Sequence, residues 1–147
     1  MLDIREMTEN DLSFVAQTEE ALFSDAWTRE SLTEELSSPF ARSYVLTEDG
    51  VPASYGLFRL LAGEGEVLRI GTLPSYRRRG FAKALLEHFE ARGKKEGLQK
   101  IFLEVRQGNT AARRLYEGMG FREIALRQSY YRNPVEDAVI YEKSEKE

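Results

Sequence analysis

One loop of the sequence concentrates positive charge just before an expected helix. Three arginines and a glycine stand in the run Tyr76-Arg77-Arg78-Arg79-Gly80-Phe81-Ala82-Lys83. Apolar residues then recur at the spacing of an amphipathic helix, at Ala82, Leu85, Leu86 and Phe89. Cations at a helix N-terminus oppose its macrodipole by about 0.3–1 kcal/mol each unless an anion binds there, and free backbone N–H groups at such a turn bind phosphate. The loop therefore predicts a phosphate or pyrophosphate site; the alternative is a solvated loop with Gly80 as a turn residue.

The type of loop narrows the class of cofactor. No Gly-Lys-Ser or Gly-Lys-Thr tripeptide of a Walker loop occurs in the chain. A dinucleotide-binding fingerprint needs three spaced glycines, and Gly80-Phe81-Ala82 supplies one of them. ATP, GTP and NAD are therefore poor candidates, and we expect a different cofactor that carries a pyrophosphate.

Glu104 is a candidate general base. It lies near the end of an apolar strand, Ile101-Phe102-Leu103-Glu104-Val105. If its carboxylate faces the interior, burial raises its pKa towards the range of a general base. If strand alternation turns it to solvent, or if a base such as Arg106 pairs with it, Glu104 is an ordinary surface residue.

Tyr116 is a candidate general acid. A phenol with a pKa near about 10 can donate a proton to a thiolate leaving group, whose acid has a pKa near about 8.5. Asn109 lies seven residues earlier and hence on the same helix face. Both residues have a structural alternative, because Asn109 is a good N-cap and Tyr116 is typical of a core aromatic residue.

Hydrophobic periodicity and turn signals predict the elements that position these groups. Strands are expected over Leu2–Glu6, 43–47, 51–61, 66–73, 100–105, 121–131 and 135–141. Helices are expected over 8–23, from 28 to before Pro39, over 80–96, and from Asn109 to 118–120. Turns are expected at Asp49-Gly50 and at 63–65. This order predicts one α/β domain over residues 1–147 with a mixed sheet.

One part of that sheet is the expected site. The strand at 66–73, the helix at 80–96 and the strand at 100–105 form a right-handed parallel crossover. Ligands bind at the carboxyl ends of such strands, where the arginine loop and Val105 both lie.

Composition argues against several other classes of function. The chain has 147 residues and a net charge of −4, which favours one domain and argues against broad nucleic-acid binding. The absence of cysteine excludes disulfides, thiolate metal sites and a cysteine nucleophile, and is consistent with the cytoplasm. His88 is the single histidine, which argues against histidine metal sites and Ser-His-Asp triads. No apolar run approaches the about 20 residues that span a bilayer and no signal-peptide pattern occurs, so no membrane association is expected.

Two motifs together resemble the GNAT N-acetyltransferases. The acetyl-CoA loop of that family, R/Q-x-x-G-x-G/A, is matched by Arg77-Arg78-Arg79-Gly80-Phe81-Ala82. Its N-x-x-A-x-x-L-Y-x-x-x-G-F segment is matched by Asn109-Thr110-Ala111-Ala112-Arg113-Arg114-Leu115-Tyr116-Glu117-Gly118-Met119-Gly120-Phe121. The order of elements agrees over nearly the whole chain. The resemblance implies the GNAT fold, with the expected strands (about seven) in a mixed central sheet splayed between the strands at 66–73 and 100–105.

A narrower resemblance is to the bacterial ribosomal-protein-alanine acetyltransferases of the RimI type. It rests on Trp27, Leu103-Glu104-Val105-Arg106, Tyr130-Tyr131 and Glu136-Asp137-Ala138. It implies Glu104 as proton acceptor and Tyr116 as proton donor. It also implies that acetyl-CoA is held, without a metal, by Ile70, Gly71, Thr72, Arg77, Arg78, Arg79, Gly80, Phe81, Ala82, Lys83, Asn109 and Tyr116. The chain departs from the pattern at Ala82, where a second glycine is common, and at Gly71-Thr72-Leu73, which replaces an Ala-Val-Asp/His step; backbone contacts should survive both changes.

The same resemblance implies direct transfer of acetyl from acetyl-CoA to an amine. The pantetheine arm would pair with the strand at 66–73 like an added strand, and its thioester carbonyl would face a backbone N–H near 70–72. A ternary complex is expected because the chain has no cysteine to form an acyl-enzyme.

The preferred acceptor is the α-amino group of a ribosomal-protein N-terminus. Its pKa of about 7.8 lies below the pKa of lysine, which is about 10.4. The α-amino group is therefore easier to deprotonate by about 3.5 kcal/mol. The alternatives are a GNAT that acetylates lysine side chains, polyamines or small amines, and a non-catalytic acyl-CoA-binding domain. Candidates for the acceptor-side wall are Phe23, Trp27, Tyr130 and Tyr131, while Glu136 and Asp137 either attract a basic peptide or form a solvated acidic turn. We expect a monomer or weak homodimer.

Overall fold

A mixed sheet runs through the middle of the molecule. The computed structural model describes residues 1–145, and within them the sheet has seven strands in the order β1-β2-β3-β4-β5-β7-β6. Their bounds are β1 Leu2–Glu6, β2 Tyr44–Glu48, β3 Val51–Leu61, β4 Glu64–Thr72, β5 Lys100–Arg106, β6 Arg122–Tyr131 and β7 Glu136–Ser144. The expected fold class is confirmed. The last two strands exchange places in space relative to the chain order, since β7 lies between β5 and β6.

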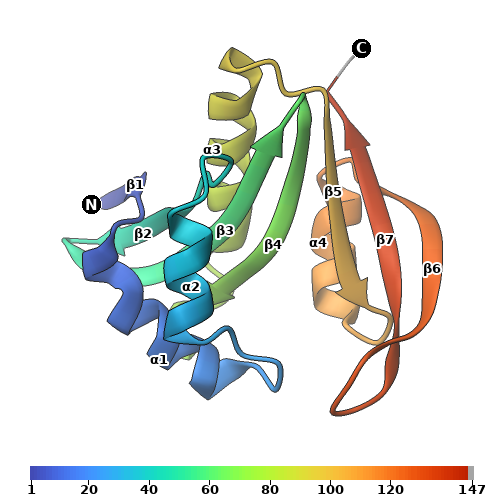
Figure 1. Ribbon diagram of the computed structural model, residues 1–147, viewed down its shortest axis with the longest axis horizontal. Coiled ribbons are helices and arrows are strands. Elements are labelled where there is room, and N and C mark those ends of the chain that lie inside the picture. Colours follow the sequence, from blue (N-terminus) through green and yellow to red (C-terminus); the bar gives the residue numbers. More distant parts are fainter. Residues whose placement is uncertain (146–147) are drawn as a thin grey trace.

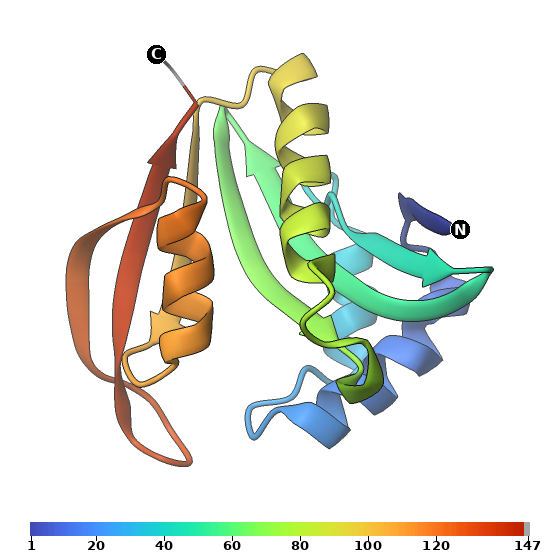
Figure 2. The same ribbon diagram turned by 180° about the vertical axis from the view of Figure 1, so that it is seen from behind.

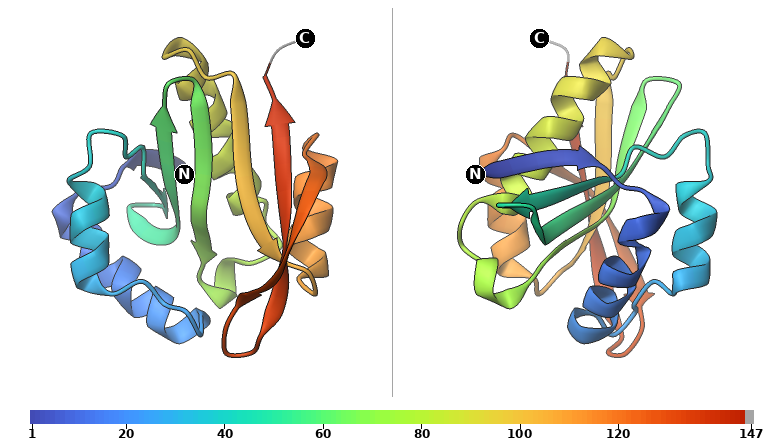
Figure 3. Two further views of the ribbon diagram at one scale, coloured as in Figure 1. Left: turned by 45° about the vertical axis from the view of Figure 1, so that its right-hand side comes forward. Right: turned by 90° about the vertical axis from the view of Figure 1, so that its left-hand side faces the viewer.

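Helices cover the two faces of the sheet (Figures 1 and 2). α1 Leu12–Leu22 and α2 Arg29–Leu36 lie on one face, and α3 Phe81–Lys95 and α4 Thr110–Gly118 lie on the other. Single 3-10 turns occur at Glu9–Asp11 and Pro74–Tyr76. Figure 3 shows that α1 and α2 lie over the N-terminal strands, so within the described chain their face of β5, β7 and β6 carries no helix. That open face adjoins the site described below.

Side-chain caps explain where the helices begin. Thr8 and Asp11 form the expected capping box, in which the Thr8 N–H donates to Asp11 Oδ2 (2.8 Å). The turn that it opens is a 3-10 turn, which continues into α1. Thr28 caps α2, and Asn109 Oδ1 accepts from the Ala112 N–H (3.2 Å) at the start of α4. Local hydrogen bonds therefore support three of the expected helix starts, whereas α3 begins after Gly80 without a side-chain cap.

Two glycine turns were expected, and the structure places the second one differently. Asp49 (φ 52°) and Gly50 (φ 83°) form the β2–β3 hairpin turn as predicted. The turn expected at 63–65 instead uses Ala62 (φ 52°) and Gly63 (φ 84°), and β4 already begins at Glu64. Gly65 is therefore a strand residue. A Cβ there would lie 2.9 Å from side-chain atoms of Phe89 and Leu98, so this glycine permits α3 to pack closely on β4.

β4 and β5 pair along only part of their length. Their parallel register runs from Glu64↔Lys100 to Val67↔Leu103. Beyond this point the two strands diverge (Figure 1), as the family resemblance implied. Among the described residues, the edge of β4 at 68–72 has no strand partner on its β5 side. β4 also bulges at Leu68, where its register with β3 shifts.

Two apolar clusters hold the helices to the sheet. The cluster under α3 and α4 is the larger, and in it Phe58 stacks on Phe89 with ring centroids 4.6 Å apart. The cluster under α1 and α2 contains Met7, Leu12, Val15, Leu32, Val45, Tyr55 and Leu57. His88 lies at the edge of the larger cluster with its ring 4.6 Å from that of Tyr44, and burial lowers its pKa. This environment is that of a packing residue.

Within residues 1–145, no helix has both the length and the apolar character that a bilayer span requires, and no group of acidic, histidine or cysteine side chains is arranged to bind a metal.

We predict that Gly65→Ala destabilises the protein by about 1–3 kcal/mol, because the added methyl group overlaps the Phe89 ring and Leu98. Thermal unfolding followed by circular dichroism would measure the loss. Gly118→Ala is the matched control, since a Cβ at this helical position meets nothing within 4 Å and its φ is not positive. Equal stability changes in the two variants would contradict the packing role of Gly65.

Candidate active site

A continuous groove follows β4 where it diverges from β5. Three adjoining cavities of ≈ 620, ≈ 390 and ≈ 420 Å³ make up this groove, and we name them the aromatic, central and loop cavities. The aromatic and central cavities share Asp25, Val67, Leu68, Arg69, Leu103, Glu104 and Tyr131. The central and loop cavities share Leu22, Phe23 and Ile70. An extended ligand could therefore lie along β4 from one end to the other.

The arginine loop forms one end of the groove. The loop cavity is lined by Ile70, Thr72, Arg77, Arg78, Gly80, Phe81, Ala82 and Lys83, among others. Arg78 (φ 64°) and Gly80 (φ 79°) both adopt left-handed backbone conformations just before α3 begins at Phe81. The N-terminus of α3, with its unpaired backbone N–H groups, therefore lies beside three cations that line the cavity: Arg77, Arg78 and Lys83. These residues fit a pyrophosphate.

Arg79 differs from the two arginines before it. Its guanidinium pairs with the Glu48 carboxylate at the end of β2 (Nη1–Oε1 3.1 Å), and this contact raises the pKa of Arg79. The guanidinium carbon also lies 4.9 Å from the centroid of the Phe81 ring. The side chain does not line the loop cavity. In this structure the Arg79 cation ties the loop to the β2–β3 hairpin.

Glu104 faces the groove and not the core. Alternation along β5 buries Ile101, Leu103 and Val105 and turns Glu104 to the other face, where its side chain is 34% exposed. Of the two orientations that the sequence left open, the structure has the solvent-facing one. Arg106, the partner considered from the sequence, pairs instead with Glu136 (3.4 Å).

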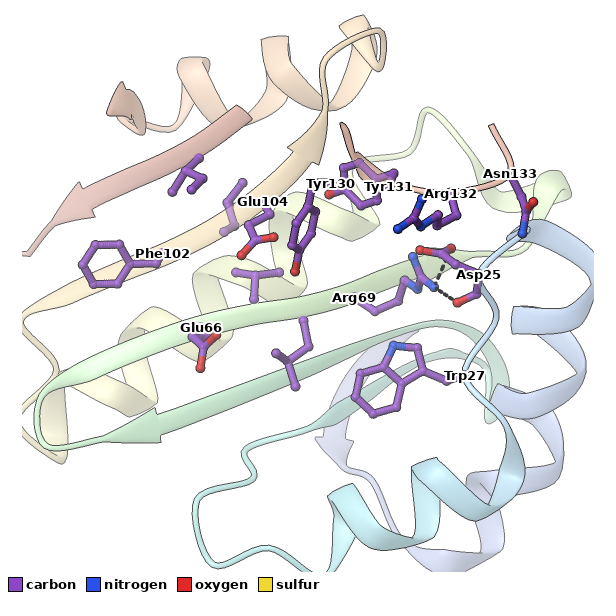
Figure 4. Close-up of a pocket in the computed structure, with 14 residues that line it drawn as sticks. Asp25, Trp27, Glu66, Arg69, Phe102, Glu104, Tyr130, Tyr131, Arg132 and Asn133 are labelled. Atoms are coloured by element: carbon purple, nitrogen blue, oxygen red, sulfur yellow. Dashed lines mark hydrogen bonds and ion pairs between the residues drawn. The ribbon is translucent and has the colours of Figure 1, made fainter. Parts of the chain in front are cut away.

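Two other side chains lie near the Glu104 carboxylate. Arg127 Nη1 lies 3.5 Å from Glu104 Oε1, and the proximity of this carboxylate together with burial raises the pKa of Tyr130. Figure 4 shows Glu104 and Tyr130 side by side at the gap between β4 and β5. The carboxylate is thus partly paired and still accessible from the groove.

Tyr116, in α4, lines the central cavity. The residue is 9% exposed, and its ring meets Phe121 edge-on at 5.7 Å. Burial raises the pKa of Tyr116 to about 12, so the phenol is protonated at neutral pH. No hydrogen bond joins this hydroxyl to another described residue. Asn109 lines the same cavity, although its side-chain oxygen also caps α4.

The predicted acceptor-side residues divide between the cavities. Trp27, Tyr130 and Tyr131 line the aromatic cavity (Figure 4), and burial raises the pKa of Tyr131 to about 12. Phe23 lines the central and loop cavities instead, so the structure sets it nearer the expected cofactor than the other three. The groove therefore brings together a cationic end, a middle with Glu104 and Tyr116, and an aromatic end.

Residues 12–121 match the sequence model of the acetyltransferase (GNAT) family. The chain belongs to this family. It is an N-acetyltransferase, and the expectation drawn from the two motifs is confirmed.

Relatives of known name are similar to this GNAT over most of its length. The [ribosomal protein bS18]-alanine N-acetyltransferase of Escherichia coli K12 is 30% identical over 142 residues, which is 95% of each chain. A putative enzyme of the same name from Bacillus subtilis is 29% identical over 138 residues, 93% of this chain and 91% of its own.

Solved structures of other acetyltransferases are similar to this chain over nearly its whole length. The crystal structure of the Escherichia coli ribosomal-protein-S18-alanine N-acetyltransferase gives a TM-score of 0.91 at 29% identity and covers 98% of this GNAT and 94% of that chain. A chain of the NatC complex bound to Gag peptide and CoA gives a TM-score of 0.86 at 21% identity, covering 99% of both, and so shares the fold.

Four charged residues of the aromatic cavity were not singled out in the sequence: Asp25, Glu66, Arg69 and Arg132. Arg69 lies in a mostly apolar strand and is paired with the buried Glu19. A signal was present, because Glu19 stands four residues after Val15 on the apolar face of α1, where a hydrophobic residue is expected. A charge on that face indicates a buried ion pair whose partner the sequence does not identify.

Glu136 and Asp137 hold the β6–β7 hairpin. Glu136 Oε2 accepts from the Gly108 N–H (2.6 Å), and Asp137 Oδ1 accepts from the Ser129 N–H (2.8 Å). Both carboxylates are thus engaged within the protein. Both residues are half-buried in β7 and do not form the solvated acidic turn considered from the sequence.

We predict that Arg78→Gln weakens the binding of coenzyme A about tenfold at low salt, because a charge-assisted contact to phosphate is lost. Titration calorimetry at two ionic strengths would show the difference shrinking as salt screens the charge. Arg92→Gln makes the same change of net charge on an exposed residue in the last turn of α3 and should leave binding unchanged. Equal effects in both variants would rule out a specific role for Arg78.

Proposed function

We propose that this GNAT transfers the acetyl group of acetyl-CoA to the α-amino group of an N-terminal alanine of a ribosomal protein. The observation that carries the proposal is the groove along β4, which has Glu104 and Tyr116 between a cationic end and an aromatic end. The likeness to the bS18-alanine acetyltransferase of Escherichia coli, 30% identical over 95% of the chain, supports the choice of acceptor.

Acetyl-CoA fits the residues of the groove. The N–H groups at 78–83 with Arg77, Arg78 and Lys83 would hold the pyrophosphate. The pantetheine amides would pair with the free edge of β4 at 70–72, which has no strand partner among the described residues. A backbone N–H of this segment would also stabilise the oxyanion that forms from the thioester carbonyl. Asn109 would contact the arm from the α4 side.

Glu104 would act as the general base. The amine nitrogen attacks the thioester carbon, the C–N bond forms, the C–S bond breaks, and the amine proton passes to the carboxylate directly or through a water. Because Glu104 faces the open groove, a water molecule can reach it. An α-amino group, whose pKa is about 7.8, gives up its proton to this base more readily than a lysine side chain, whose pKa is about 10.4.

Tyr116 would supply the proton to sulfur. Burial keeps the phenol protonated, and its hydroxyl has no partner among the described residues that would compete for the proton. Because a thiol with a pKa of about 8.5 is the stronger acid, the hydroxyl acts first as a hydrogen-bond donor to the developing thiolate. The departing sulfur then takes the proton of the Tyr116 hydroxyl, and solvent in the groove reprotonates the Tyr116 oxygen.

We predict that Glu104→Gln and Tyr116→Phe each lower kcat by about a hundredfold or more, because each removes a proton-transfer group. Glu104→Gln should also leave the Kd for coenzyme A within about twofold of wild type, since Glu104 does not hold the cofactor. Glu66→Gln, which removes another carboxylate of the groove, is the control. A Glu104→Gln enzyme with full activity from low to high pH would show that Glu104 is not the base.

The acceptor can be tested by following thiol release from acetyl-CoA with a peptide that starts with alanine, the same peptide with a blocked N-terminus and an internal lysine, and spermidine. We expect turnover with the free N-terminus and a loss of at least about tenfold with the others, as the pKa difference requires. Turnover of spermidine or lysine alone would replace the proposal by a small-amine or lysine acetyltransferase. Tight coenzyme A binding without turnover would favour a non-catalytic domain.

A further inference from the structure

A buried glutamate joins the acceptor-side wall to the cofactor strand. Glu19 in α1 is 0% exposed, and a carboxylate in such a place is costly unless its oxygens are satisfied. Oε1 accepts from the Trp27 backbone N–H (3.0 Å) and from Arg69 Nε (3.1 Å), and Oε2 accepts from the Tyr55 hydroxyl (2.6 Å). One carboxylate thus links the segment after α1, strand β4 and strand β3.

Arg69 makes the second half of the link. It follows the bulge in β4, and its side chain is 15% exposed. Its Nη2 donates to the Asp25 carbonyl (2.9 Å) and to Asp25 Oδ1 (3.1 Å), as Figure 4 shows. The guanidinium carbon lies 3.9 Å above the centroid of the Phe23 ring. A single side chain of β4 therefore contacts Phe23, Asp25 and, through Glu19, Trp27.

The segment that these contacts hold has no regular structure of its own. Residues 23–28 form turns and coil between α1 and α2. Phe23 lines the central cavity and Trp27 the aromatic cavity, so the position of this segment sets the width of the groove on the acceptor side. Arg69 ties the segment to β4 directly at Phe23 and Asp25, and Glu19 extends this tie to the Trp27 backbone.

We propose that Arg69, through Glu19 and Asp25, is a positioning residue that sets the acceptor-side wall against the strand that carries the thioester. The proposal rests on the proposed function for the identity of the acceptor, but its structural part is independent of it. Arg69 does not itself line the loop cavity, where the pyrophosphate would bind, and it meets that cavity only through Phe23, so its loss should affect the acceptor more than coenzyme A.

The chain contains a matched pair for comparison. Glu35 in α2 is 4% exposed and pairs with Arg59 of β3 (Nε–Oε2 2.9 Å). This pair, like the first, holds a buried helix carboxylate to the sheet through an arginine. Neither residue lines the groove. Arg59→Met and Arg69→Met therefore each remove the arginine partner of a buried helix carboxylate; they differ in what that pair positions and in the exposure of the arginine, 43% for Arg59 and 15% for Arg69.

The first experiment is steady-state kinetics on both variants. Arg69→Met should raise the KM for the acceptor peptide about tenfold while kcat and the Kd for coenzyme A stay within about twofold. Arg59→Met should lower Tm without changing KM, and Arg69→Lys, which restores one cation, should recover part of the KM. Equal KM values in the two methionine variants would overturn the proposal.

The second experiment needs no acceptor. Trp27 is the only tryptophan of the chain, so its fluorescence reports on the segment directly. We expect Arg69→Met to raise the acrylamide quenching constant of Trp27 about twofold and to shift its emission to longer wavelength, as greater exposure of the indole requires, with no change in Arg59→Met. Unchanged quenching in Arg69→Met would refute the positioning role even if peptide acetylation were confirmed. Changed quenching without any peptide turnover would refute the proposed function alone.

If Arg69→Met fails to fold, Asp25→Ala answers the same question. The Asp25 side chain is 46% exposed, and its loss leaves the buried Glu19–Arg69 pair intact. A smaller rise in KM, about threefold, with normal coenzyme A binding is then expected from the loss of one partly exposed contact. No change in either KM or quenching would contradict the proposal.

Discussion

The free edge of β4 is the constraint on which the rest of the structure depends. β4 pairs with β3 along its length, but its pairing with β5 ends at Val67 and Leu103. Backbone groups at a strand edge need partners, and water or an added strand can supply them. The groove leaves this edge open to an extended ligand, and every candidate site residue lies along the groove or in the loop at its end.

A sheet that opens in its middle needs a separate support for each half. α1, α2 and α3 pack on the N-terminal strands, while α4 supports the C-terminal strands. The Tyr141 hydroxyl of β7 donates to Glu117 of α4 (2.7 Å) and accepts from Arg113 (2.9 Å). Each wall of the groove is thus held by its own helix, and the walls join where β4 and β5 still pair.

Charged side chains near the groove either hold the walls or face the ligand. Arg79 and Arg69 are tied to carboxylates within the protein, whereas Arg77 and Arg78 line the loop cavity. The carboxylates divide in the same way, since Glu19 is fully buried and satisfied while Glu104 keeps access to the groove. This division keeps the reacting groups accessible on walls whose positions are set by buried pairs.

The sequence by itself determined the elements, the helix caps, the Asp49-Gly50 turn and the family motifs, because these depend on residues close together in the chain. Tertiary structure alone decided which arginine of the run pairs with a carboxylate of the protein, since Arg79 meets Glu48, 31 residues away. It also decided which way Glu104 faces, which depends on how β5 pairs with β7, and that Arg69 meets a glutamate 50 residues distant. Periodicity reports the burial of a residue along its own element, but contacts between distant segments choose its partner.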